Sequence, residues 1–296
     1  MDGILNINKP QGRTSFSVVA MVRRLSRERR VGHAGTLDAM AGGVLPVCLG
    51  QGTRVVEFLM GASKVYRARV RLGIATDTYD ATGKIIQKGD ASGISREQLG
   101  SALDTFCGPI MQTPPMYSAL KYRGQRLYKL ARAGITVDRK SRPAMVYHIK
   151  LVDFEPPMAT IEVECARGTY IRSLAHDLGQ LLGCGAHLEH LVRLKYGPFD
   201  IEDAVSLTQL EEACGDSTWQ KLVYPIDIVL NHWSSVVVSN EQERVIKNGG
   251  GVVMEDGMAG VDGESRCRAY NQDGCFIAIL HFDPERRQWQ PEKVFV

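Results

Sequence analysis

Two segments of the chain alternate between apolar and polar side chains, and this period of two restricts each to a β-strand that buries one face. Residues 65–72 alternate apolar side chains with arginines, and residues 158–165 repeat the alternation. The apolar sets are Tyr66, Ala68, Val70 and Leu72 in the first segment and Ala159, Ile161, Val163 and Cys165 in the second. Successive side chains of a strand point to opposite faces, so both segments predict half-buried strands of one or more sheets.

Residues that cap helices precede apolar residues at helical spacing in several places. The expected helices follow Thr14 or Ser15, Ser95, Thr169 and Ser239. In the first of these helices, the apolar face is expected to consist of Phe16, Val19, Val22 and Leu25. After the last helix, glycines at 249–251 should end it, and short strands are expected near 252–254, 266–270 and 275–282.

The composition is that of an ordinary globular protein. The 296 residues are 44% hydrophobic and 23% charged, which fits one large or two moderate domains. No apolar run reaches about 18 residues and no signal peptide is recognisable, so we expect a cytoplasmic protein without a membrane span.

The seven cysteines lack a Cys-x-x-Cys pair, which predicts reduced thiols and no zinc site. His187 and His190 could share one helix face, but without a third ligand nearby a structural role is expected.

The net charge of +3 conceals a segregation of charge along the chain. Residues 1–35 hold seven basic side chains against two acids, and residues 121–142 hold eight against Asp138 alone. Residues 200–232 hold seven acids against Lys221. Two basic regions balanced by an acidic one predict a surface that binds a polyanion, whereas the alternative for each run is an ordinary solvated helix face.

Asp38 is the acid with the most unusual surroundings. No other acid occurs between Glu28 and Glu57, and four glycines at positions 32, 35, 42 and 43 leave little side-chain bulk around its carboxylate. Glycine permits positive φ and close approach of a ligand, so a substrate could reach this side chain. A helix cap or a turn is the alternative role, because aspartate is favoured at both.

Further blocks of sequence extend this pattern along most of the chain. They comprise residues 9–12, 32–38, 42–46, 63–67, 115–121 with Gly124, 167–174 and 191–194. In this order the blocks closely resemble the TruB family of tRNA pseudouridine synthases, over roughly residues 3–230, and an ordered set is far more specific than one glycine motif. Ala34, Met40 and Ala41 depart from the common family pattern, but they are small or flexible and leave the implied contacts available.

The resemblance implies an α+β fold with two domains. A pseudouridine synthase domain with a mixed, largely antiparallel sheet is expected over residues 1–233, and a small β-rich, PUA-like pseudobarrel over 234–296. Within the first domain, a protruding basic RNA-binding insertion is expected at about 109–145, where Pro114 and Pro115 interrupt the preceding helix.

The implied reaction isomerises uridine 55 in the T-loop of tRNA to pseudouridine. The base is detached from C1′ of the ribose, rotated and rejoined through its C5 carbon. Because this isomerisation is redox-neutral and needs no group donor, neither a cofactor nor a metal is expected.

Three residues match catalytic positions of the family. Asp38 is the expected nucleophile, because a carboxylate can attack an electron-poor carbon or stabilise oxocarbenium character at C1′. A base adduct, a sugar ester and elimination to a glycal all stay open. Arg172 matches the arginine that pairs with this acid and orients it, with a salt bridge that only braces the fold as the alternative. Tyr66 matches the tyrosine that stacks on the target base and could transfer a proton, although the alternating strand also explains it as a core aromatic.

Five further residues match positions around the substrate. His33 corresponds to a histidine that contacts RNA while the target nucleotide is flipped, and Asp80 to a polar pocket residue. Tyr170 and Leu191 match the pocket wall, whereas Lys9 is expected to support the active-site loops. The alternatives are a turn role for His33, an Asx turn at Asp80 and core packing for Tyr170 and Leu191.

The expected partner is tRNA. The basic runs would contact its phosphates and the C-terminal domain its acceptor end, and no obligatory protein partner is indicated. The leading alternative is a tRNA-binding or tRNA-folding protein without turnover, and the second is a base-exchanging glycosyltransferase, which also uses a carboxylate near C1′. The combination of Asp38, Tyr66 and Arg172 argues against a pure binder, which does not need it.

Overall fold

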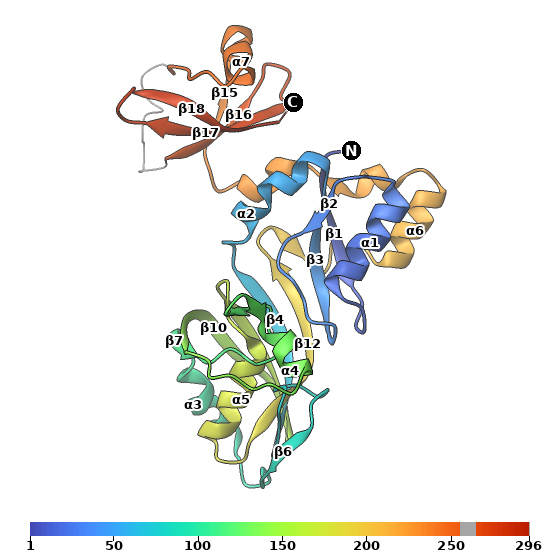
Figure 1. The fold of residues 1–296 in the computed structure, drawn as a ribbon, viewed down its shortest axis with the longest axis vertical. Helices are drawn as coiled ribbons and strands as arrows, with labels where there is room; N and C mark the ends of the chain where they lie inside the picture. The colour runs from blue at the N-terminus through green and yellow to red at the C-terminus, as the bar shows by residue number, and fades with distance from the viewer. Residues whose placement is uncertain (255–264, 296) are drawn as a thin grey trace.

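One large sheet forms the frame of the molecule in the computed structural model, which describes residues 1–254 and 265–295 (Figure 1). Eight of its ten strands follow one path, in the order β14 (Val223–Tyr224), β1 (Gly3–Lys9), β3 (Ala41–Leu49), β12 (Ala186–Tyr196), β4 (Lys64–Leu72), β11 (Met158–Cys165), β10 (Arg142–Glu155) and β7 (Gly108–Gln112). The other two are β2 (Val31–His33), which pairs with β3, and β13 (Phe199–Asp200), which pairs with β12.

The pairing within this sheet is antiparallel except between β3 and β12, which are parallel. The expected mixed, largely antiparallel sheet is therefore confirmed. The two alternating segments are the neighbouring strands β4 and β11, with Tyr66 opposite Val163. Their apolar sets are buried, so the predicted half-buried strands are also confirmed.

Helices flank the sheet in two groups. Near its lower end in Figure 1 lie α3 (Arg96–Asp104) and α5 (Ile171–Leu181), and beside β1 lie α1 (Ser15–Ser26) and α6 (Leu207–Gly215). The short helical segments are η1 (Gly50–Val55), α2 (Val56–Leu59), η2 (Trp219–Leu222) and η3 (Ile226–Leu230). No helix in the described ranges is long and apolar enough to cross a membrane.

Local capping explains where several helices begin. Thr14 accepts a hydrogen bond from the Ser17 amide at the start of α1, and Ser95 forms the predicted capping box of α3. The predicted cap at Thr169 is wrong, because Tyr170 occupies the N-cap of α5. The Thr169 hydroxyl instead donates to the carbonyl of Met145 on β10, which draws it away from the helix.

The apolar face predicted for α1 is wrong at its first residue. Phe16 is 76% exposed, whereas Val18, Val19 and Val22 are buried. An α-helix turns by about 100° per residue, so Phe16 lies more than 90° around the axis from Val18 and Val22. The repeated spacing of three residues drifts around the helix and does not stay on one face.

His187 and His190 lie in strand β12, so they do not share a helix face. The Nδ1 atom of His187 is 2.8 Å from the carbonyl oxygen of Ile74, and its Nε2 is 3.1 Å from Oε2 of Glu189. No group of three His, Cys, Asp or Glu side chains in the described part of the chain is placed to share a metal ion.

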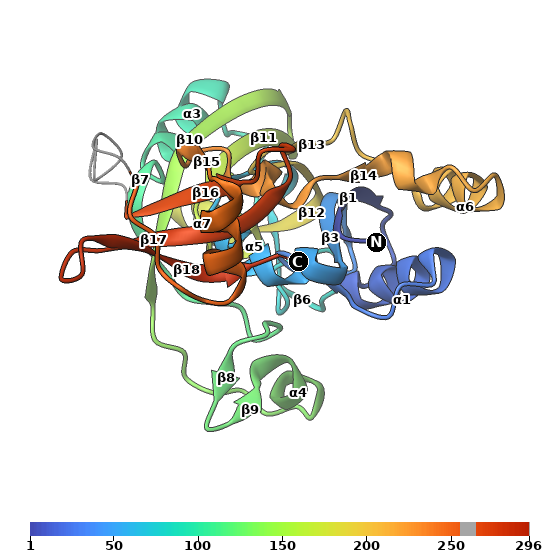
Figure 2. The same ribbon diagram turned by 90° about the horizontal axis from the view of Figure 1, so that it is seen from above.

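Two excursions extend from the sheet. The first is a hairpin of β5 (Ile74–Thr76) and β6 (Ile85–Lys88), which follows β4. The second, between β7 and β10, contains β8 (Lys121–Tyr122), β9 (Gln125–Arg126) and α4 (Leu127–Arg132) and projects away from the sheet (Figure 2). This second excursion carries the basic run of the sequence.

The last part of the chain forms a separate small sheet with its own core. Its order is β15 (Ser235–Val237), β16 (Arg266–Tyr270), β17 (Phe276–Asp283) and β18 (Gln288–Val294), next to α7 (Asn240–Lys247). Within the described residues this sheet is open and forms no closed barrel, which qualifies the pseudobarrel expectation. The strand expected at 252–254 is reduced to a single bridge between Val252 and Trp289, and the last strand was not expected.

Candidate active site

Asp38 lies in the loop between β2 and β3, and the main chain of this loop is fixed from both sides of the aspartate. The Ser15 hydroxyl donates to the carbonyl of Leu37 at 3.1 Å and accepts from its amide at 2.9 Å. The ammonium of Lys9 donates to the carbonyls of Arg13 at 2.6 Å and Pro10 at 3.1 Å, and lies 3.5 Å from that of Ala39. The carboxylate therefore stands on a loop tied to the start of α1.

A buried arginine holds this carboxylate. Nη2 of Arg172 is 2.8 Å from Oδ2 of Asp38 and donates to the carbonyl of Tyr117 at 2.9 Å, while Nη1 is 3.6 Å from Oδ2 of Asp80. The side chains of Arg172 and Asp80 are 5% and 7% exposed, whereas that of Asp38 is 45% exposed. The guanidinium is thus anchored behind the one carboxylate that a solvent-borne substrate can reach.

Asp80 forms a turn and an ion pair at once. Its Oδ1 accepts from the hydroxyl of Thr78 at 2.7 Å and from the amide and hydroxyl of Thr82 at 3.0 and 2.6 Å. These bonds engage Oδ1 and leave Oδ2 toward Arg172. The first turn of a helix offers a cation no favourable dipole interaction, so the two carboxylates account for a charge at that position.

Arg193 is a further buried cation of the site whose role the sequence did not reveal. Only 1% exposed, it donates through Nε to the carbonyl of Val44 at 2.7 Å and through Nη2 to that of Gly35 at 2.9 Å. These carbonyls lie on either side of the Asp38 loop, and Arg193 is also the β12 partner of Tyr66 on β4. Arg193 follows buried Leu191 by two residues, so both side chains point to the same face of the strand. A charged residue on that buried face was the feature of the sequence that could have revealed its role.

Tyr66 and His33 lie close to this second cation. Tyr66 is 9% exposed, and burial raises the pKa of its phenol, an effect that the adjacent Arg193 guanidinium opposes. His33 ends β2 and is half-buried. Burial, together with the positive charge of Arg193, lowers the pKa of its imidazole, which favours the neutral form.

The remaining predicted residues surround the Asp38 loop at different depths. Tyr170 is half-buried, its main chain exchanges hydrogen bonds of 3.0 and 3.2 Å with the Gln112 side chain, and burial raises the pKa of its phenol. Leu191 is buried in β12 opposite Ala41 and Ala68. Lys9 is fully buried, which lowers the pKa of its ammonium from 10.5 to about 8 against the opposing influence of Asp38.

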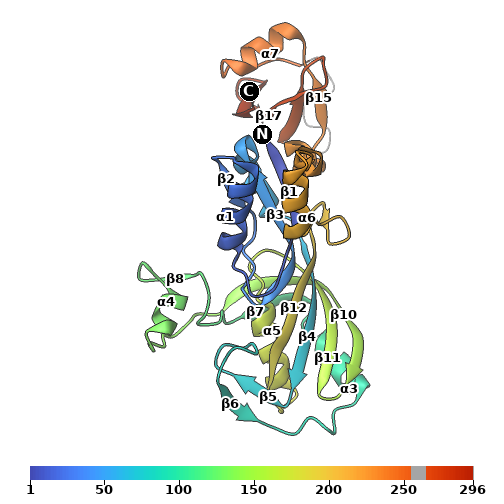
Figure 3. The ribbon, with the colours of Figure 1, turned by 90° about the vertical axis from the view of Figure 1, so that its right-hand side faces the viewer.

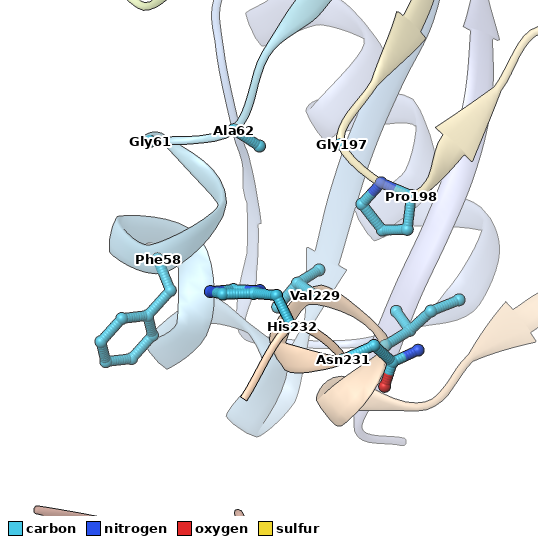
Figure 4. Close-up of a pocket in the computed structure, with 9 residues that line it drawn as sticks. Phe58, Gly61, Ala62, Gly197, Pro198, Val229, Asn231 and His232 are labelled. Carbon is cyan, nitrogen blue, oxygen red and sulfur yellow. The ribbon is translucent and has the colours of Figure 1, made fainter. Parts of the chain in front are cut away.

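A pocket of about 590 Å³ lies elsewhere, at the junction leading to the C-terminal module (Figure 4). Its lining consists of Phe58, Gly61, Ala62, Gly197, Pro198, Ile228, Val229, Asn231 and His232. None of the predicted site residues lines it, and most of its lining is apolar. The Asp38 site is therefore distinct from this pocket.

Two family models match consecutive parts of the chain. Residues 23–171 match the N-terminal domain of TruB family pseudouridylate synthases, and residues 172–231 match the C-terminal domain of tRNA pseudouridylate synthase B. The chain belongs to the TruB family. Asp38, Asp80 and Tyr66 fall within the first match, and Arg172 begins the second.

Curated relatives agree with this TruB assignment over the whole chain. A tRNA pseudouridine synthase B of Dehalococcoides mccartyi is 44% identical over 296 residues, covering 100% of this chain and 97% of the relative. A namesake from Symbiobacterium thermophilum is 49% identical over 213 residues, or 71% of each chain.

Solved structures extend the likeness to the arrangement in space. A chain of a Cbf5–Nop10–Gar1 complex is similar with a TM-score of 0.77 and 27% identity, covering 99% of this TruB-family chain and 85% of the other. A chain of an H/ACA RNP bound to a substrate RNA containing 2′-deoxyuridine gives a TM-score of 0.75 at 26% identity, with 99% and 85% covered.

Proposed function

We propose that this protein is a tRNA pseudouridine synthase that isomerises uridine 55 of the T-loop, with Asp38 as the reacting group. The observation that carries the proposal is the position of Asp38. Its carboxylate is half-exposed, lies on a loop whose main chain is hydrogen-bonded on both sides, and pairs with a buried arginine. The chain that carries it belongs to the TruB family. The name of these relatives, tRNA pseudouridine synthase B, supplies the substrate class.

The reaction breaks the bond from N1 of uracil to C1′ and forms one from C5 to C1′. C5 loses a proton and N1 gains one, so atoms and electrons balance without a cofactor. The target must leave its stack to expose these atoms, and a flipped uracil entering beside Asp38 would meet the Tyr66 ring and the wall near Tyr170 and Leu191. His33, on the strand before the loop, is the proposed contact with the RNA that this nucleotide leaves.

The ion pair gives Asp38 a defined orientation during this reaction. A charge-assisted hydrogen bond from Arg172 fixes one carboxylate oxygen, and the other is left for the substrate. Such a carboxylate suits attack on the base, attack on C1′ and elimination alike. Tyr66 is the proposed proton-transfer group, because its hydroxyl belongs to the same site.

The basic surfaces are the proposed docking sites for tRNA. Lys121, Arg123 and Arg126 are exposed on the projecting insertion, which we assign to residues 109–145. We assign residues 1–233 to the catalytic domain and 234–296 to a PUA-like domain that contacts the acceptor end. We further propose that the protein acts in the cytoplasm without an obligatory protein partner, because it carries basic surfaces of its own.

An assay on purified protein tests the proposal. Unmodified tRNA transcript is incubated with the protein, and pseudouridine is mapped by a modification-specific chemical label. We expect one modified site at position 55, none with Asp38→Asn, and none with a transcript carrying cytidine there. Full activity of Asp38→Asn would refute the proposed role of the carboxylate.

The same assay separates the alternatives. A tRNA-binding or tRNA-folding protein would bind the transcript and leave uridine 55 unmodified in the wild type. A base-exchanging glycosyltransferase would release free uracil or incorporate labelled base from solution. Neither outcome is expected from an isomerase that retains its base.

A further inference from the structure

The exposed face of α1 carries an aromatic side chain followed by basic ones. At about 100° per residue, Phe16, Ala20 and Arg23 fall within about 60° of one another around the helix, and buried Val18 and Val22 lie at least about 100° away from them. Arg27 follows as the C-cap residue of the helix. All four are exposed, Phe16 by 76%. This arrangement leaves a large aromatic ring in water at the N-terminal end of a basic stripe.

The start of α1, and with it the main chain of Phe16, lies beside the Asp38 loop. Ser15, the residue before Phe16, holds both the amide and the carbonyl of Leu37, the residue before Asp38. Consecutive Cα atoms are 3.8 Å apart, so the two hydrogen bonds place Phe16 within a few residue lengths of Asp38. The capped first turn of α1 keeps this position fixed.

The basic insertion lies on the same side of the sheet as α1 (Figure 3). An RNA strand bound between the insertion and α1 would therefore pass the Asp38 loop with cationic side chains on both flanks. Aromatic side chains stack on unpaired bases, whereas arginines contact phosphates. An aromatic next to the reacting group and arginines further along fit an unpaired nucleotide whose backbone continues along α1.

We propose that Phe16 is a stacking platform for an unpaired base of the substrate RNA, at a nucleotide flanking the one that reaches Asp38. The inference rests on the proposed function and adds a substrate contact to it. Arg23 and Arg27 contact the phosphates that follow this nucleotide. The stacked base holds the strand open beside the flipped uridine.

Three substitutions at one position separate stacking from other effects. Base stacking on an aromatic side chain is worth about 5- to 150-fold in affinity. We expect Phe16→Ala and Phe16→Leu to raise the Kd for unmodified tRNA transcript by a factor in that range, and Phe16→Trp to stay within about twofold of the wild type. Single-turnover rates at saturating enzyme should change little, because the ring does not touch the reacting atoms.

The dependence of Kd on salt shows whether a substitution removes a contact with phosphate or an uncharged contact. Phe16→Ala removes no charge, so its slope of log Kd against log salt should equal that of the wild type, while Arg27→Ala should lower the slope by about one. Ile86→Ala is the matched control, since Ile86 is 60% exposed on β6 and lies outside the stripe. It should bind tRNA as the wild type does.

The outcomes distinguish this inference from the proposed function. Wild-type affinity in Phe16→Ala, equal affinity of the leucine and phenylalanine forms, or a fall in Tm that accompanies lost binding would each overturn the stacking role. Failure of the wild type to form pseudouridine would refute the proposed function instead, and the binding series would still test the stacking contact.

Discussion

Replacing Arg172 with lysine tests whether the geometry of the guanidinium, and not only its charge, supports the reaction. Two nitrogens of Arg172 contact the carboxylates of Asp38 and Asp80 and the carbonyl of Tyr117. A lysine carries one nitrogen and no rigid fork, so it cannot keep all three contacts. Arg172→Ala is a poorer test, because removing one partner of a buried ion pair costs about 3–5 kcal/mol and would confound activity with folding.

The expected loss follows from the contacts that lysine gives up. Hydrogen bonds to charged groups contribute about 1.5–3 kcal/mol, and about 1.4 kcal/mol of lost transition-state stabilisation slows a reaction tenfold. If the lysine keeps contact with Asp80 and releases Asp38, turnover should fall by about 10- to 150-fold. The positive charge remains, so the affinity for tRNA should change by less than about threefold.

The two quantities are measured separately. Single-turnover formation of pseudouridine at saturating enzyme gives the rate, filter binding at fixed salt gives the Kd, and thermal melting shows that the variant is folded. Arg69→Lys is the matched control, since Arg69 is exposed on β4 and should change neither quantity. Turnover of Arg172→Lys within twofold of the wild type, or a loss confined to Kd, would refute the orienting role of the fork.

Substitutions at three other positions have expected outcomes. Arg193→Met leaves the carbonyls flanking the Asp38 loop unpaired, so single-turnover rates should fall at least tenfold with tRNA affinity retained, and Arg193→Lys should not restore them. Tyr66→Phe keeps the ring and removes the hydroxyl, so filter binding should be unchanged while turnover falls by about 10²- to 10⁴-fold; normal turnover would rule out proton transfer by the phenol. Burial raises the pKa of Asp177 from 3.8 to about 6, so the folded state favours the protonated acid and loses stability as pH rises through this window. Asp177→Asn should therefore raise stability at pH 7.5 by about 1–2 kcal/mol, allowing for partial solvent exposure, but not at pH 4, as thermal melts at both pH values would show.

The sequence predicts those parts of the fold that depend on local periodicity. The alternating strands around Tyr66 and Ile161 and the capping box at Ser95 are confirmed, because strand parity and capping are set by a few neighbouring residues. The predictions for Thr169 and Phe16 fail where a tertiary contact decides. Thr169 is drawn to β10, and three buried valines already cover the core-facing side of α1.

The candidate site is predicted less completely than the fold. Asp38 and Arg172 were paired by resemblance, and their 2.8 Å contact agrees with that pairing, while their catalytic roles stay predictions. The contacts of Arg193 depend on carbonyls about 150 residues away in sequence, which no local pattern encodes. The proximity of Phe16 to Asp38 likewise depends on the hydrogen bond between the Ser15 hydroxyl and Leu37.

The parallel pairing of β3 with β12 in the large sheet explains how residues so distant in sequence meet. The loop before β3 carries Asp38, and β3 pairs in parallel with β12 through Ala41 and Leu191. The 11 residues of α5 run back along the sheet by about 16 Å, and β12 returns by about the same distance from Ala186 to Leu191. The start of α5, and with it Arg172, therefore lies level with Leu191 and next to the loop that precedes Ala41. The ion pair follows from matching helix and strand lengths, so the two residues are brought together by the topology as a whole.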